Sequence, residues 1–211
     1  MKILIDNGHG LDTQGNCSPH VIGTGISGEA VIDGRFSEAM FTRMVAKEVV
    51  KRLKAQGYDA EQLTPEERDV PLETRVWRAN QYCTKMGAAN VIVVSIHTNA
   101  SGNGEQWAQG RGWEVYTSPG QTRSDILATS LGLEAERLLP GMKIRSDYSD
   151  SDLDKEANYY ILTKTRCPAV LTENLFHDNV EDVKFLTSDE GFERIVRLHV
   201  DGISEFVEDN A

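Results

Sequence analysis

The chain has 211 residues, of which 39% are hydrophobic and 26% are charged, and these values are typical of a globular protein with a buried core. Its 22 Lys and Arg residues stand against 33 Asp and Glu residues, which gives a net charge of −11. This acidic balance argues against a nucleic-acid partner and against attachment to anionic lipid, because both need clustered Lys and Arg. The length predicts one domain over residues 1–211.

No segment of the sequence is typical of a membrane span or a secretion signal. The most apolar stretch, AANVIVVSI at 88–96, is far shorter than the roughly 20 residues that cross a bilayer. The amino terminus reaches Asp6 before the apolar part of a signal peptide could form, so we expect synthesis in the cytoplasm without such a signal. Three scattered cysteines predict reduced thiols rather than a disulfide framework or a cysteine zinc site; they are Cys17, Cys83 and Cys167.

The first third of the chain predicts a strand, a long loop and a helix. An apolar run at 2–6 ends in Asn-Gly-His-Gly, which is typical of a strand that feeds a tight turn. Residues 11–36 are rich in glycine and lack periodicity, so we expect a surface loop, and a loop of that length is usually functional. Ser37 is predicted to cap a helix that ends at Gly57 and carries apolar residues at helical spacing.

The remainder of the chain alternates between strands and helices. We expect strands at 90–96, 113–117 and 168–173, and helices at 71–86, 125–139 and 192–207. The first of these strands is a β-branched run without alternation, which is typical of a central strand buried on both faces. This order of elements indicates an α/β fold with a mostly parallel sheet.

Polar side chains stand at the ends of three predicted strands. His9 follows the first strand, His97 follows the second, and Glu173 ends the third. Because ligand sites in open α/β sheets lie beyond the carboxyl ends of the strands, we expect these residues to meet. Glu38 is a fourth candidate, since it lies in the first turn of the helix after Ser37, where the helix dipole stabilises an ionised carboxylate.

Two imidazoles and one carboxylate, from His9, His97 and Glu38, form a common ligand set for a catalytic zinc ion that keeps one position open. Zinc lowers the pKa of a bound water and polarises a carbonyl group. Glu173 would take the proton of the water and return it to a leaving amine. Each of these residues also has an ordinary structural explanation as a hydrogen-bonded polar group near a strand or helix end, and the spacing alone leaves both explanations open.

Three further polar residues are weaker candidates. Glu29 lies in the glycine-rich loop and competes with Glu38 as the third metal ligand. Asn99 is a candidate substrate contact, although a turn residue at a strand end is the simpler explanation. His177 is a reserve metal or substrate contact, whereas His199 falls among apolar helix positions and is expected in the core.

Five segments resemble the zinc-dependent N-acetylmuramoyl-L-alanine amidases of the amidase-3 family. These segments are ILIDNGHG, SEAMFTRMVAKEVVKRLKAQG, PLETRVWRAN, ANVIVVSIHTNA and YYILTKTRCPAVLTENLFHDN. They occur in the family's order and cover the chain from Ile3 to about the end of the final helix. SIHTNA and CPAVLTEN are the most specific, and their joint occurrence with GHG is hard to obtain by chance.

The resemblance implies a three-layer domain, with a mixed, mainly parallel sheet of about six strands and helices on both faces. It implies that His9, Glu38 and His97 bind one zinc ion and that Glu173 is the catalytic glutamate. The implied reaction is hydrolysis of the peptidoglycan amide between the lactyl group of N-acetylmuramic acid and L-alanine of the stem peptide.

The sequence departs from the family pattern at two places. Gly10-Leu11 stands where the family often has a second glycine, and Asn174-Leu175 stands where it commonly has a small residue and a glycine. Both changes are expected at the rim of the site, so we expect them to alter substrate preference more than chemistry.

Two other functions are compatible with the pattern. One is a peptidoglycan-binding module that kept the fold without catalysis, and the other is a zinc carboxypeptidase on a similar scaffold. The intact ligand set and Glu173 count against the pure binding module. We expect a monomer that acts on the cell wall, either as a phage endolysin released from the cytoplasm or as a bacterial autolysin.

Overall fold

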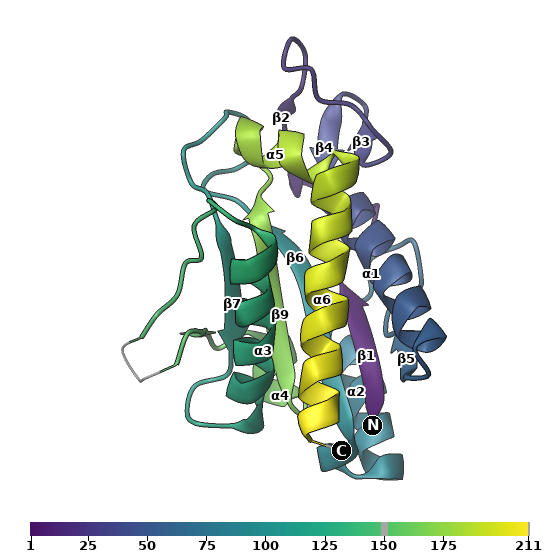
Figure 1. Cartoon of the computed structure of the whole chain (residues 1–211). Helices are drawn as coiled ribbons and strands as arrows, with labels where there is room; N and C mark the ends of the chain where they lie inside the picture. The colour runs from purple at the N-terminus through teal and green to yellow at the C-terminus, as the bar shows by residue number, and fades with distance from the viewer. Residues whose placement is uncertain (149–151, 211) are drawn as a thin grey trace.

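The computed structural model describes residues 1–148 and 152–210 (Figure 1). Within these residues, six strands form one sheet in the order β5-β1-β6-β9-β7-β8. In chain order these strands are β1 (Lys2–Asn7), β5 (Asp59–Gln62), β6 (Val91–Asn99), β7 (Trp113–Thr117), β8 (Lys155–Glu156) and β9 (Ala169–Phe176). Only the pair of β7 and β9 is antiparallel among the described strands of this sheet. The predicted mixed, mainly parallel sheet of about six strands is confirmed.

Helices cover both faces of the sheet. On one face lie α1 (Glu38–Ala55), α3 (Arg123–Leu138) and α6 (Asp189–Asp209), and on the other lie α2 (Leu72–Met86) and α4 (Tyr160–Lys164) (Figure 1). A short α5 (Val180–Leu186) precedes α6, and a single 3-10 turn, Ala88–Asn90, precedes β6. In the part of the chain that the structure describes, no helix is both long and apolar enough to cross a membrane.

The central strands are buried on both faces, as their unbroken apolar runs predict. In β1, Ile3 and Ile5 pack in the core cluster beneath α1, α3 and α6, whereas Leu4 packs in the cluster beneath α2 and α4. All three side chains are fully buried. A sheet covered in this way leaves its strand ends, rather than its faces, as the place for polar chemistry.

The prediction of a plain loop over residues 11–36 was wrong. This segment contains most of a small antiparallel sheet of β2 (Cys17–His20), β3 (Val31–Ile32) and β4 (Arg35–Ser37), with β4 in the middle. The strands have two to four residues and are separated by glycine turns, so they show no period-two pattern. The elements β5, β8, α4 and α5 escaped prediction because they are also short.

The strands that carry the candidate site continue further than predicted. β6 ends at Asn99 and β9 ends at Phe176, so each includes three residues more at its carboxyl end. His97 and Glu173 therefore lie within the sheet, directly opposite each other in the β6–β9 register. The polar side chains suggested strand ends, but backbone pairing does not depend on side-chain polarity. The cap of α1 is as predicted, because the Ser37 hydroxyl accepts a hydrogen bond from a first-turn N–H.

Candidate metal centre

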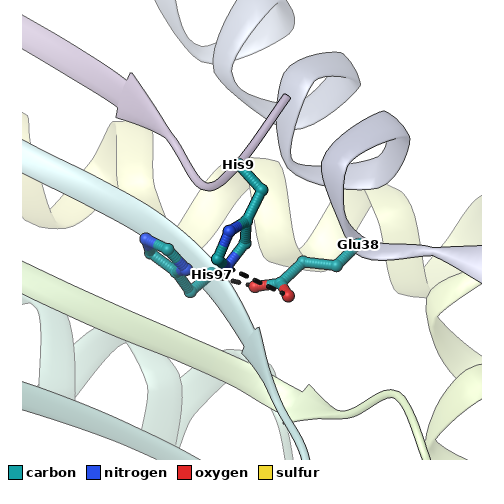
Figure 2. A group of neighbouring side chains, drawn as sticks. All are labelled: His9, Glu38 and His97. Carbon is teal, nitrogen blue, oxygen red and sulfur yellow. Dashed lines mark hydrogen bonds and ion pairs between the residues drawn. The ribbon is translucent and has the colours of Figure 1, made fainter. Parts of the chain in front are cut away.

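His9, Glu38 and His97 come together near the carboxyl ends of β1 and β6, at the start of α1 (Figure 2). One potential ligand atom from each residue lies within 4.8 Å of the other two. The Glu38 carboxylate is 3.5 Å from Nε2 of His9 and 3.1 Å from Nδ1 of His97. The imidazole rings meet edge to face, with centroids 5.1 Å apart. Two imidazoles and a carboxylate in this arrangement form a possible site for a divalent metal ion.

Glu38 is the first residue of α1 and is only 2% exposed. Its Oε1 accepts a hydrogen bond from the backbone N–H of Thr98 at 2.9 Å, and its Oε2 lies 3.9 Å from Nδ1 of His177. Burial alone would raise the pKa of Glu38, but the hydrogen bond with His97 and the nearby histidine charges outweigh burial and hold it below its ordinary value. The surroundings therefore favour the ionised form, which is the form that binds metals.

The glycines on both sides of His9 are required by close packing. A Cβ atom on Gly8 would lie 2.5 Å from Nδ1 of His97, and one on Gly10 would lie 1.9 Å from the backbone nitrogen of Asp69. His9 itself has φ 59°, in the left-handed region that non-glycine residues rarely adopt. Such strain persists where the surrounding structure fixes it, and here it directs the imidazole toward Glu38.

A buried polar network connects the end of β1 to α2 and β6. Arg75 of α2, 3% exposed, donates from Nη1 to the Asp6 carboxylate at 2.9 Å and to the Asn7 carbonyl at 2.7 Å. The other oxygen of Asp6 accepts from the Ser95 hydroxyl at 2.7 Å. Removing one partner of a buried ion pair costs about 3–5 kcal/mol, so this network fixes the glycine turn relative to β6 and α2.

Glu173 lies on β9, opposite His97 on one side and opposite Glu114 on the other. Its Oε2 is buried and accepts no hydrogen bond from any described residue. Burial raises the pKa of Glu173 to about 8; His97 opposes this shift, while Glu38 and Glu114 add to it. A carboxyl group whose pKa lies near neutrality is suited both to accept and to donate a proton.

A cleft of about 450 Å³ lies toward the carboxyl ends of β1, β6 and β9, on the side of the sheet that α2 and α4 cover. His9, His97 and Glu173 line it on one side. Three half-exposed apolar or aromatic side chains from the two covering helices also line it; they are Leu72, Tyr159 and Tyr160. A few convergent polar groups against an apolar wall are typical of a site for a small organic ligand.

Two of the weaker candidates lie outside the candidate metal-ligand group, which consists of His9, Glu38 and His97. Glu29 is exposed in its loop and is not part of the group that Glu38 forms with the two histidines. Asn99 donates from its amide nitrogen to the Glu114 carboxylate, while its oxygen accepts from the backbone N–H of Ala100 at 2.8 Å. Asn99 is thus engaged with β7, at the edge of the site.

The two other histidines are both buried. His177 is 3% exposed, and its Nδ1 lies 3.0 Å from the Thr98 hydroxyl and 3.9 Å from Glu38. It stands behind the metal-ligand group. His199 is fully buried in α6, with Nε2 2.9 Å from the Thr172 hydroxyl, so its expected place in the core is correct.

Two buried charged residues of the site, Arg75 and Glu114, escaped the sequence analysis. Arg75 is one of several charged residues of α2, and its burial beside Asp6 follows from how α2 packs on the sheet. The sequence pattern alone does not indicate this packing. Glu114 offered a signal, because a charged residue inside the apolar strand WEVYT has to find partners on one face of the sheet.

Comparison with known sequences gives a consistent result. The sequence model of the N-acetylmuramoyl-L-alanine amidase family matches residues 3–205. The chain is 34% identical over 116 residues to the N-acetylmuramoyl-L-alanine amidase CwlM of Bacillus licheniformis, covering 53% of this chain and 38% of that protein. It is 28% identical over 207 residues to the sporulation-specific N-acetylmuramoyl-L-alanine amidase of Bacillus subtilis, covering 97% and 68%. An endolysin of Bacillus phage SPP1 is 31% identical over 118 residues, covering 55% and 40%.

Solved structures share the fold. The catalytic domain of CwlV, an N-acetylmuramoyl-L-alanine amidase from Bacillus (Paenibacillus) polymyxa var. colistinus, superposes with a TM-score of 0.73 at 23% identity, covering 99% of each chain. The amidase AmiC2 of Nostoc punctiforme gives a TM-score of 0.74 at 22% identity, covering 99% of this chain and 97% of that one.

The matches to CwlM and to the phage endolysin span 38% and 40% of those proteins, so this chain covers less than half of either relative.

Proposed function

This chain belongs to the N-acetylmuramoyl-L-alanine amidase family, and we propose that it hydrolyses the peptidoglycan amide between the lactyl group of N-acetylmuramic acid and L-alanine. The observation that carries the proposal is the meeting of His9, Glu38 and His97 at one point, together with the cleft that His9, His97 and Glu173 line. Residues 1–211 would act as one catalytic domain on the cell wall. We propose that the chain does so as a monomer.

We propose that His9, Glu38 and His97 hold one zinc ion. The donor set fits this ion, because two imidazole nitrogens and a carboxylate favoured in its ionised form lie within reach of one point. The ion-pair contacts of Glu38 among the described residues are all to histidines, so a divalent cation would supply the positive charge that a buried carboxylate needs. When bound, zinc polarises the scissile carbonyl and lowers the pKa of water.

Glu173 is the residue that we propose moves the proton. It accepts the proton of the attacking water and then delivers it to the departing alanine nitrogen, so the carboxyl group returns to its starting state. Its position supports this role, because adjacent strands lie about 4.8 Å apart and Glu173 is directly opposite His97. Its buried Oε2, which lacks a donor among the described residues, is available to accept that proton.

The apolar side of the cleft would bind and shield the substrate. Leu72 begins α2, and Tyr159 and Tyr160 lie at the start of α4. These two helices therefore position the apolar side chains that line the cleft. Aromatic rings of this kind pack against the faces of sugars and peptide side chains and exclude water from the reacting groups.

Digestion of purified peptidoglycan with and without a chelator tests this function. We expect new alanine amino groups without new reducing sugar ends, loss of this release with the chelator, and recovery when zinc is restored. Release of a carboxyl-terminal amino acid would instead indicate a carboxypeptidase. Binding to the wall without any release would indicate a binding module.

A further inference from the structure

A row of charged side chains crosses the sheet beside the candidate metal centre. In the strand register, His97 is opposite Glu173, and Glu173 is opposite Glu114. Trp113 forms an isolated parallel bridge with Ile144, which places the next residues, Glu114 and Arg145, side by side. Arg145 Nε lies 3.2 Å from the Glu114 carboxylate. Because residues opposite each other project to the same face of a sheet, the row continues from the metal centre past Glu173 to Arg145.

A second cation reaches the same carboxylate from the neighbouring row. Lys155 of β8 is opposite Tyr116 in the register, and its Nζ contacts the Glu114 carboxylate. The Lys155 ammonium also lies 5.7 Å from the centroid of the Tyr116 ring. Tyr116 in turn packs against Tyr159, which lines the cleft, with ring centroids 5.3 Å apart. Lys155 is therefore connected to the cleft wall through two aromatic rings, whereas Arg145 lies 5.2 Å from the ring centroid of Phe176.

Among the described ion pairs of this cluster, one carboxylate, that of Glu114, contacts both cations. Glu114 has a side chain only 1% exposed and carries one negative charge, whereas Arg145 and Lys155 supply two positive charges. The side chains of Arg145 and Lys155 are 31% and 25% exposed, so both reach solvent. Arg145 directs Nε at Glu114, and a guanidinium has further donors arranged in a planar fork that matches a carboxylate.

We propose that Arg145, assisted by Lys155, binds a carboxylate on the peptide part of the substrate. Two strand spacings separate Glu173 from Arg145, or about 10 Å. An extended peptide covers this distance in about three residues. The site therefore selects a peptide whose free carboxylate lies within about three residues of the scissile amide. This inference rests on the proposed amidase function and adds a preference to it.

Paired substrates test the preference. Two N-acetylmuramoyl peptides are compared, identical except that one has a free side-chain or α-carboxylate at its second or third residue and the other has a carboxamide there. We expect kcat/KM of the unaltered protein to be about ten- to a hundredfold higher for the carboxylate peptide, mainly through KM, because charge-assisted hydrogen bonds are lost with the amide. Arg145→Gln should reduce the ratio to about threefold or less, mainly by raising KM for the carboxylate peptide. The matched control is Arg137→Gln, a surface arginine paired with Glu134.

A binding measurement separates this inference from the proposed function. Calorimetry on the zinc-loaded Glu173→Gln protein keeps both peptides intact and measures their affinities, and thermal melting shows whether each variant is folded. The double variant Glu173→Gln, Glu114→Gln lacks the Glu114 carboxylate, which competes with the peptide for Arg145 and Lys155. The carboxylate peptide should therefore bind to it several-fold more tightly. A purely structural cluster would instead weaken binding of both peptides or leave both unchanged.

Equal affinity for the two peptides, or an equal loss for both in Arg145→Gln, would overturn the inference. If neither peptide is hydrolysed by the unaltered protein but the carboxylate peptide still binds preferentially, the amidase proposal fails and the binding site stands.

Discussion

Two halves of the site hold their carboxylates in opposite ways. Glu38 receives a backbone N–H from Thr98 and lies against His97 and His9, and its pKa is held below its ordinary value. Glu173, on the neighbouring side of His97, has a buried oxygen without a donor among the described residues, and burial raises its pKa to about 8. Burial is common to both. The groups that face each carboxylate decide the direction of its pKa shift, and they suit Glu38 to the proposed role of a fixed anion and Glu173 to that of a proton carrier.

The largest effect is expected for Glu173→Gln, which keeps the shape of the side chain and removes its ability to exchange a proton. Turnover should fall by about 10²–10⁴-fold, the usual contribution of a positioned acid-base group. Release of alanine amino groups from peptidoglycan measures this loss. The matched control Glu29→Gln changes an exposed glutamate outside the site and should keep full activity. Activity within tenfold of the unaltered protein would show that Glu173 is not the proton carrier.

The same contrast separates the histidines. His97 has its pKa raised, because contact with Glu38 outweighs burial, whereas burial lowers the pKa of His199 from 6.5 to about 4. Neutral His199 therefore stabilises the fold above pH 6.5, and this contribution is lost as the pH falls from 6.5 through about 4. The loss at pH 4 is about 3 kcal/mol, from about 1.36 kcal/mol per pKa unit.

Urea unfolding of the chelator-treated protein between pH 7 and pH 4 measures this dependence. The free energy of unfolding should fall more steeply with pH in the unaltered protein than in His199→Gln, which is less stable at pH 7 but has no proton to take up at that position. Parallel pH profiles for the two proteins would show that the pKa of His199 is the same in the folded and unfolded states, which would contradict this prediction.

A smaller effect is expected for Gly8→Ala, which tests the rigidity of the metal-ligand half. The new methyl group would have to displace the His97 ring, whose Nδ1 lies 2.5 Å from its position. Disturbed orientation of a ligand commonly lowers metal affinity by about 10–100-fold, and competition against a chromophoric chelator measures it. Gly102→Ala is the matched control, because its methyl group would meet the carboxylate of Asp178 at an ordinary 3.6 Å. Unchanged affinity in Gly8→Ala would mean that the turn is more adaptable than its packing indicates.

The residues that meet at the metal centre were within reach of sequence reasoning. His9 and His97 follow apolar runs that form β1 and β6, and Glu38 follows a serine that caps α1, so hydrophobic pattern and capping chemistry place all three at one end of the sheet. The family resemblance carried by these motifs is confirmed by the match over residues 3–205.

The partners of Glu173 could not be predicted in the same way. Glu114 and Arg145 join it through strand register, and the antiparallel pairing of β7 with β9 leaves no local trace in the sequence. The structure does explain one departure from the family pattern. Leu175 has φ 66° and is fully buried, so this position favours the glycine that the family commonly has, and the leucine is retained with its side chain in the core.

The division of roles between Glu38 and Glu173 is tested most directly by the zinc content of Glu38→Gln and Glu173→Gln after dialysis against the same limiting zinc buffer. Circular dichroism verifies that both variants are folded. We predict about one zinc ion per chain in Glu173→Gln, as in the unaltered protein, and a large loss of zinc in Glu38→Gln. Equal zinc content in the two variants, whether both keep the ion or both lose it, would contradict the division of roles between the two carboxylates.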